Sequence, residues 1–260
     1  MAANYTIGLS TGRTGTKYLA ELFSHCGQKS INSVHESRYS RIFNIIGTMY
    51  RSGFISENFV RHTWKSLKTN HKSINEYDTY IDFNNHLYAI ANIIQSEQNN
   101  LRLIHIVRDP RTYIRSHINW STYRLKSYIA NRLTPFWQPS GALIGQYTRT
   151  EWSRASRIEK YAWIWNYKNR LIESYKDMGI PYLFIRFEDL FASEILLRSN
   201  VEKMSSFIGI DMPSDINADK YMPVNSSKIY INEAYVPRYE SEYVIVNKIC
   251  GDLMQKYNYL

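Results

Sequence analysis

Short apolar runs alternate with amphipathic segments along this chain of 260 residues. Five of the runs predict buried β-strands, at residues 5–9, 30–34, 79–83, 101–107 and 182–185. Apolar positions at helical spacing predict helices that begin at residue 16 and that cover residues 86–97, 156–177, 192–208 and 239–258. Strands alternating with helices indicate an α/β fold, with a central, mostly parallel sheet flanked by helices on both faces.

The chain is expected to form one domain over residues 1–260, because it has no internal repeat, low-complexity tract or Pro/Gly/Ser linker. Residues 121–155 fit the alternation poorly, since prolines and glycines lie there among aromatic residues. We interpret this segment as a variable lid or insertion over an acceptor site. A surface excursion without function is the alternative explanation.

The composition, with 44% hydrophobic and 21% charged residues, excludes a fibre or a largely disordered chain. Cys26 and Cys250 are too few for a disulfide framework or a four-cysteine zinc site, which favours a reducing compartment. The N-terminus lacks a signal-peptide pattern, and no run approaches about 18 apolar residues. We therefore expect a cytoplasmic protein that does not bind a membrane.

The net charge favours an anionic partner, because 32 basic residues exceed 23 acidic ones and leave +9. The basic residues are scattered, and none of the usual nucleic-acid modules is present. A concave site for a small anion is therefore favoured over nucleic acid.

The first strand leads into a loop rich in small residues and then into a helix. Glycines allow a tight turn, threonines add hydroxyl donors, and cations add charge at the helix N-terminus, where backbone amides favour an anion. The residues concerned are Gly12, Arg13, Thr14, Gly15, Thr16 and Lys17. This loop is predicted to bind a phosphate; a simple glycine turn would not account for its two cations.

The loop departs from the common nucleotide-binding motifs. Aligned on Gly15, the kinase pattern G-x-x-x-x-G-K-S/T would need a glycine at Ser10 and a lysine at Thr16. The dinucleotide pattern G-x-G-x-x-G also fails, since Gly8, Gly12 and Gly15 are four and three residues apart.

A second motif follows the strand at residues 101–107. The strand ends at Arg108, Pro110 breaks it, and Ser116 lies eight positions after the arginine on the next helix. Such a pattern is used to grip a second phosphate. An ordinary surface pair of Arg108 with Asp109 is the alternative.

Together the two motifs resemble those of sulfotransferases that use 3′-phosphoadenosine 5′-phosphosulfate (PAPS). Residues 12–16 look like the 5′-phosphosulfate loop of that family, and residues 107–111 with Ser116 look like its 3′-phosphate motif. Residues 182–190, which end in Glu-Asp-Leu, are similar to a later strand segment, and residues 225–228 agree more weakly. The motifs occur in the right order and about 95 residues apart. The resemblance implies a P-loop-like α/β sulfotransferase fold.

The resemblance also implies a set of site residues. Arg13 or Lys17 would stabilise the leaving oxygen, although relatives usually have a small hydroxylated residue at the position of Lys17. No metal is expected. The predicted cofactor-binding residues are Gly12, Arg13, Thr14, Gly15, Thr16, Lys17, Arg108, Ser116, Arg186, Ser227 and Lys228.

A general base is expected next to the first loop, because His35 and Glu36 follow the second strand. Relatives often have a catalytic glutamate or histidine there, so Glu36 is the first candidate and His35 the second. A simple ion pair of Glu36 with Arg38 or Arg41 is equally compatible with the sequence. Glu36 is also assigned to acceptor binding, as are two residues near the end of another strand, Asn84 and His86.

The predicted function is transfer of a sulfuryl group from PAPS to a hydroxyl of a small molecule, with release of adenosine 3′,5′-bisphosphate (PAP). An amine acceptor is the second choice, and a natural product is a plausible acceptor. The mechanism would be in-line displacement assisted by the base. Two alternatives stay open, a divergent P-loop kinase and a non-catalytic nucleic-acid-binding module. The oligomeric state is open as well, a homodimer included.

Overall fold

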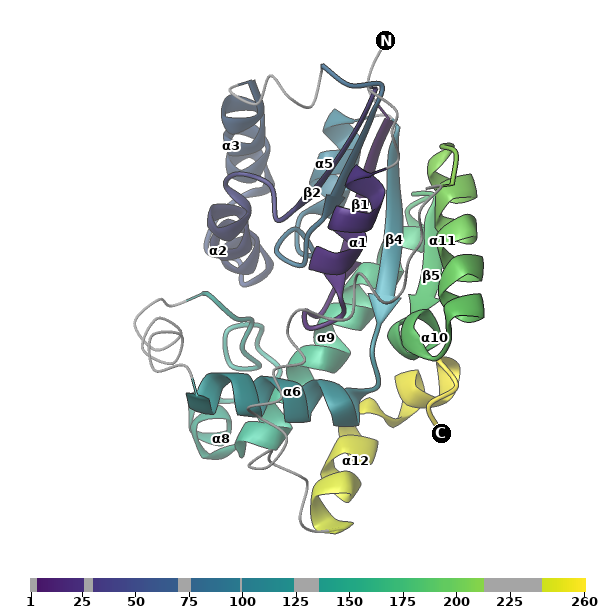
Figure 1. Ribbon diagram of the computed structural model, residues 1–260. Helices are drawn as coiled ribbons and strands as arrows, with labels where there is room; N and C mark the ends of the chain where they lie inside the picture. Colours follow the sequence, from purple (N-terminus) through teal and green to yellow (C-terminus); the bar gives the residue numbers. More distant parts are fainter. Residues whose placement is uncertain (1–3, 26–29, 70–75, 99, 124–135, 213–239) are drawn as a thin grey trace.

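The computed structural model describes residues 4–25, 30–69, 76–98, 100–123, 136–212 and 240–260 (Figure 1). Its centre is a five-stranded sheet in the order β2-β3-β1-β4-β5, in which every neighbouring pair is parallel. The strands are β1 (Asn4–Ser10), β2 (Ile31–His35), β3 (Thr79–Phe83), β4 (Leu101–Val107) and β5 (Tyr182–Arg186). All five predicted strands are confirmed, with ends that shift by at most one residue.

Helices cover both faces of the sheet. One face carries α2 (Ser40–Arg51), α3 (Glu57–Thr69), α5 (Ala91–Glu97) and α9 (Arg157–Asp177), packed on the side chains of Tyr5, Ile7 and Leu9. The other carries α1 (Thr16–Ser24), α10 (Phe187–Phe191) and α11 (Glu194–Ile208), packed on Ile81, Ile104 and Ile106. Alternate residues of one strand thus point to opposite helical layers, which confirms the predicted α/β architecture.

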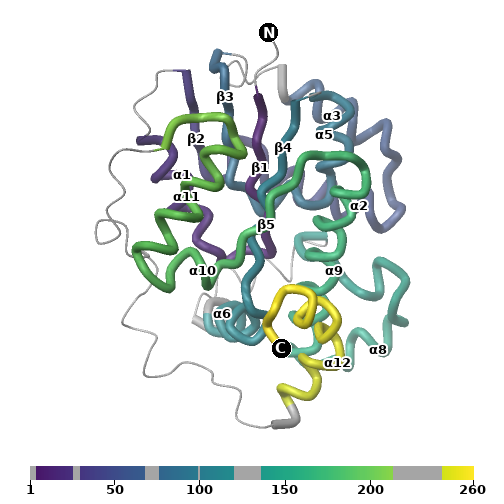
Figure 2. The backbone as a smooth tube through the Cα atoms, turned by 90° about the vertical axis from the view of Figure 1, so that its right-hand side faces the viewer, coloured from purple at the N-terminus to yellow at the C-terminus, as the bar shows by residue number. Residues whose placement is uncertain are grey.

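A third apolar cluster lies at the carboxyl end of the sheet. Here α6 (Pro110–Tyr123) and α12 (Glu240–Lys256) pack against α9 and against Val107, the last residue of β4. Figures 1 and 2 show these helices, with α8 (Arg149–Arg154), gathered below the strand ends. The loops that leave the parallel strands open toward this edge, where ligands of open α/β sheets bind.

Three helical regions differ from the expectation. The pattern does not predict α2 and α3, which fill residues between β2 and β3. The helix expected from residue 86 begins at Ala91, because the amide of His86 is bonded to Asn84 in a turn after β3. The helix expected from residue 192 is preceded by the short α10, and Ser193 caps the start of α11.

The helices expected at 156–177 and 239–258 are present as α9 and α12. Cys250 is buried with its thiol near the carbonyl of Ala162. Over the described ranges, no helix has the length and apolar character needed to cross a membrane.

A buried histidine ties the sheet to α9. His105 on β4 donates from Nε2 to Asn169 Oδ1 at 2.9 Å, and its Nδ1 accepts from the hydroxyl of Tyr182. Burial lowers the pKa of His105 to about 4. The histidine is therefore neutral in the folded protein at neutral pH.

Acid should destabilise the fold through this residue. The unfolded state binds a proton near pH 6.5 and the folded state only near pH 4, so stability is lost as the pH falls through this window. Urea unfolding should show a loss of about 2 kcal/mol from this group between pH 6.5 and 5. His105→Gln should remove that part of the pH dependence; an unchanged slope in the variant would contradict the assignment.

Candidate active site

The loop between β1 and α1 curls around one hydroxyl group. Ser10 Oγ accepts from the amide of Gly12 at 3.1 Å and from the hydroxyl of Thr14 at 2.8 Å. Gly12, Arg13 and Gly15 have φ values of 96°, 60° and 71°, so the backbone turns through left-handed conformations. This geometry leaves the first amides of α1 facing the loop, where they can bind an anion.

Glycine is required at position 15 for space as well as conformation. A Cβ there would lie 2.9 Å from the ring of Phe191 in α10. Helix α10 therefore packs directly against the predicted phosphate loop.

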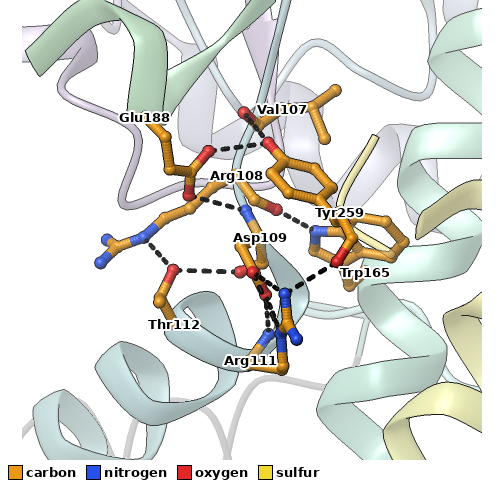
Figure 3. Close-up of polar contacts among 8 residues, drawn as sticks. All are labelled: Val107, Arg108, Asp109, Arg111, Thr112, Trp165, Glu188 and Tyr259. Atoms are coloured by element: carbon orange, nitrogen blue, oxygen red, sulfur yellow. Dashed lines mark hydrogen bonds and ion pairs between the residues drawn. The ribbon is translucent and has the colours of Figure 1, made fainter. Parts of the chain in front are cut away.

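Figure 3 shows how the end of β4 is held. The indole Nε1 of Trp165 donates to the carbonyl of Arg108 at 2.8 Å, and the Tyr259 hydroxyl donates to the carbonyl of Val107 at 3.0 Å. Glu188 accepts from the amide of Asp109 at 2.9 Å and lies 2.8 Å from the same tyrosine hydroxyl. Contacts from α9, α10 and the C-terminal residues thus fix the backbone that carries Arg108.

The side chain of Arg108 turns toward the first loop. Its Nη1 donates to the carbonyl of Arg13 at 2.7 Å, its Nε donates to Thr112, and its guanidinium lies 4.6 Å from the centre of the Phe187 ring. Burial lowers the pKa of Arg108 below its usual value, but an arginine stays charged at neutral pH. Asp109 is instead paired with Arg111 at 2.5 Å. The alternative interpretation, a surface ion pair between Arg108 and Asp109, is therefore wrong.

The two predicted phosphate motifs meet in space. Arg13 Nε donates to Ser116 Oγ at 3.2 Å, across 103 positions of sequence, and Arg108 reaches the backbone of the same arginine. Two cations and a hydroxyl therefore lie beside the loop that leads into the N-terminus of α1. Such an arrangement favours a ligand with more than one anionic group.

A carboxylate and an imidazole lie close together on the other side of the strand ends. Glu36 follows β2 with a φ of 52°, and its Oε1 lies 3.3 Å from His86 Nε2. Burial alone would raise the pKa of Glu36, but the hydrogen bond with His86 and the nearby positive charges outweigh it and lower this pKa. Glu36 is therefore ionised at neutral pH, and its hydrogen-bond partner is His86, whereas Arg38 and Arg41 form no ion pair with it.

The family comparison decides the class of protein. The family model described as the sulfotransferase domain matches residues 6–228, which is most of the chain. This protein belongs to the sulfotransferase family. No curated protein shows a significant sequence match to it.

Solved sulfotransferases resemble this one in structure. The sulfotransferase domain from the curacin biosynthetic pathway has 12% identity and a TM-score of 0.53 over 97% of this chain and 98% of that one. The domain from the Synechococcus PCC 7002 olefin synthase has 14% identity and a TM-score of 0.47, covering 96% and 94%. A sulfotransferase from Alicyclobacillus acidocaldarius has 12% identity and a TM-score of 0.45, covering 84% and 88%. The first likeness confirms the predicted fold, and the family model identifies a sulfuryl transferase.

Not every predicted residue of this sulfotransferase lies at the cluster of Arg13 and Arg108. Lys17 is 57% exposed on α1 and pairs with Glu21 at 3.6 Å. Arg186 stacks on Tyr259 with its guanidinium 4.6 Å from the ring centre, at the end of β5. Ser227 and Lys228 lie outside the described residues.

The two remaining candidates have structural partners. His35 Nε2 lies 3.2 Å from the hydroxyl of Thr16, and burial lowers the pKa of this histidine, so a neutral imidazole contacts the start of α1. Asn84 is fully buried; it bonds Asp82 at 3.0 Å and accepts from the amide of His86 at 3.0 Å. Asn84 thus lies beneath the site and shapes the turn that carries His86.

Part of the predicted lid lies beside this pair. Trp137 has its ring centre 5.5 Å from that of His86, and its carbonyl accepts from Asn44 at 2.6 Å. Residues 124–135 of the same segment lie outside the described residues. The contact supports the interpretation of residues 121–155 as a lid, which stays a prediction.

Sequence reasoning missed the residues that hold Arg108. In the sequence, Trp165 is typical of a core residue of an amphipathic helix, and Tyr259 is the second residue from the C-terminus. Each bonds a backbone carbonyl far away in the sequence, by 57 and 152 positions. No local pattern signals such a contact; only the periodicity that places Trp165 on the buried face of α9 gives a hint.

Removing the Tyr259 hydroxyl should loosen this network. Tyr259→Phe leaves the Val107 carbonyl buried without its donor and removes the contact with Glu188, so the free energy of unfolding should fall by about 2 kcal/mol. Tyr243→Phe changes a more exposed tyrosine and should cost less than about 0.5 kcal/mol. Urea titrations of both variants check this; equal stabilities would contradict the role given to Tyr259.

Proposed function

We propose that this sulfotransferase takes its sulfuryl group from PAPS and transfers it to a hydroxyl of a small molecule, with an amine as the second choice. The observation that carries the proposal is the meeting of the two motifs, in which Arg108 bonds the backbone of Arg13 and Arg13 bonds Ser116. PAPS has anionic groups at both ends of its ribose. A loop of amides next to two guanidinium groups fits such a ligand.

The predicted binding residues form two groups, one for each end of the donor. The amides from Arg13 to Thr16 would hold the 5′-phosphate, while Arg108 and Ser116 would hold the 3′-phosphate. The guanidinium of Arg108 lies on the face of Phe187, and we propose that this aromatic ring packs against the adenosine part. Ser227 and Lys228 stay predictions from the sequence for the same phosphate.

The charge that develops on the leaving oxygen needs a cation. We assign this role to Arg13 over Lys17, because Lys17 is drawn to Glu21 on the outer surface of α1. PAPS supplies an activated sulfuryl group, and its bond to the phosphate oxygen breaks as the acceptor oxygen attacks the sulfur from the opposite side. Arg13 would then stabilise the electron pair left on the phosphate. We expect the reaction to proceed without a metal ion.

Glu36 is proposed as the base that takes the proton of the acceptor hydroxyl. His86 keeps this carboxylate ionised and oriented, and the ring of Trp137 adds an apolar surface for the acceptor. His35, bonded to Thr16, is better placed to support the loop. The predictions of a natural-product acceptor, a cytoplasmic location and no nucleic-acid partner rest on the sequence, and a homodimer stays open.

Donor binding can be tested with Arg108→Ala. Loss of a charge-assisted contact should weaken the affinity for PAP by about 30-fold, as measured by calorimetric titration. Arg115→Ala removes an exposed arginine from the same helix and should bind PAP normally. Stabilisation of the unaltered protein by ATP with magnesium, and not by PAP, would favour the kinase and overturn the proposal.

The base can be tested with Glu36→Gln. Turnover should fall by about 100-fold while the affinity for PAP stays unchanged, because the amide cannot accept the proton. Turnover is measured with radiolabelled donor and an acceptor from a panel of hydroxyl and amine compounds. Glu21→Gln, on the outer face of α1, is the matched control. A nearly normal rate for Glu36→Gln would move the role of base to another residue.

A further inference from the structure

A lysine is buried on α9 without a carboxylate partner among the described residues. Lys168 is only 4% exposed, and its Nζ lies 4.4 Å from the centre of the Tyr88 ring. Burial lowers the pKa of Lys168 to about 7. Burying an unpaired ammonium group is costly, and a buried lysine with such a lowered pKa is a candidate functional group.

Two further polar groups lack partners beside the predicted phosphate loop. His117 Nε2 and Asn85 Oδ1 are buried, and neither has a hydrogen-bond partner within the described ranges. Both residues face Gly12: a Cβ added to this glycine would lie 2.9 Å from Asn85 Nδ2 and 3.8 Å from His117 Nε2. The unpartnered Asn85 atom, Oδ1, can only accept, but Asn85 Nδ2 and His117 Nε2 face Gly12 and can donate to an oxygen atom there.

Positive charges act on the imidazole of His117. After burial, the charges of Lys168, Arg13 and Arg108 are what lower its pKa, to about 3. His117 is therefore neutral and can donate or accept a hydrogen bond. The charges of Lys168, Arg13 and Arg108 act on this one neutral ring with no described carboxylate contributing, which favours an anion beside His117.

Helix α9 brings Lys168 to this place. Tyr161, Trp165 and Lys168 are spaced four and three residues apart and share one face of the helix. The ring of Tyr161 packs 5.3 Å from that of His117, and Trp165 bonds the carbonyl of Arg108. The helix runs from the sheet face to the carboxyl edge beside α6 (Figure 1).

The two sides of the loop face different partners. Gly15 packs on Phe191 and near Phe187, which lies against Arg108, whereas Gly12 faces Asn85. Asn85 directly precedes His86, the partner of the proposed base. The Gly12 side of the loop therefore faces the turn that carries the partner of the proposed base.

We propose that Lys168, His117 and Asn85 form a subsite beside Gly12 that binds the sulfonate oxygens of the transferred sulfuryl group. The inference rests on the proposed use of PAPS and adds three catalytic residues to it. The loop and Arg108 hold the two phosphates of PAPS, and this subsite holds the sulfuryl group that is transferred. Lys168 thus supplies, from a distant helix, charge at the transferred group.

The comparison of PAPS with PAP isolates this subsite, because only PAPS carries the sulfuryl group. Without any acceptor, Lys168→Met should weaken PAPS binding by about tenfold and change PAP binding by less than about twofold. His117→Phe should act in the same direction. Lys176→Met, at an exposed position near the end of the same helix, should change neither affinity.

A proton count gives a second measurement that a purely structural lysine would not change. At pH 8 Lys168 is largely neutral, and a bound sulfonate favours its charged form, so PAPS binding should take up a proton that PAP binding does not. Calorimetry in buffers of different ionisation enthalpy measures this uptake, which Lys168→Met should abolish. The neighbouring Tyr88 and His117 do not titrate near this pH, since burial moves their pKa values far from it.

The outcomes separate the two proposals. Equal losses for PAPS and PAP in Lys168→Met, or no loss in either, would overturn the subsite while leaving the donor assignment intact. Failure of the unaltered protein to bind PAP would overturn the donor assignment, and the subsite with it. The melting temperature of unliganded Lys168→Met should match or exceed that of the unaltered protein. A large drop would indicate a structural lysine. In that case Lys168→Gln is the second variant in which PAPS and PAP binding are compared.

Discussion

The hydrogen bond from Arg108 to the carbonyl of Arg13 joins the two parts of the site, and the surrounding structure holds its ends in place. One end is the left-handed turn of the loop after β1. The other is the end of β4, fixed by Trp165 and Tyr259. Because β1 and β4 are parallel neighbours, both ends emerge at the same edge of the sheet. A shift of either strand would separate the two cations.

Concentrated positive charge is the electrostatic consequence of this arrangement. Arg13, Arg108 and Lys168 all act on His117, and burial lowers the pKa of Arg108 and of Lys168. Like charges in a poorly solvated region repel one another, so the empty site is less stable than a neutral one would be. An anionic ligand relieves this repulsion. Binding energy and the stabilisation of a leaving oxygen therefore have the same physical origin.

The acceptor side is built from different elements and carries the opposite charge. Glu36 comes from the end of β2, His86 from the turn after β3, and Trp137 from the segment before α8. The buried Asn84 fixes the turn by bonding the amide of His86. The hydrogen bond with His86 and the nearby positive charges lower the pKa of Glu36, so this carboxylate is ionised and able to accept a proton.

The sequence by itself determined the strands, their parallel arrangement and the glycine loop, because apolar periodicity and glycine conformation are local properties. It also pointed to Arg108 and Ser116 through their spacing. Only the tertiary structure decided that Lys17 pairs with Glu21, that Glu36 pairs with His86, and that Trp165 and Tyr259 hold the end of β4. Those outcomes depend on which side chains meet across long stretches of chain. Such meetings follow from the packing of helices on the sheet, which no local pattern encodes.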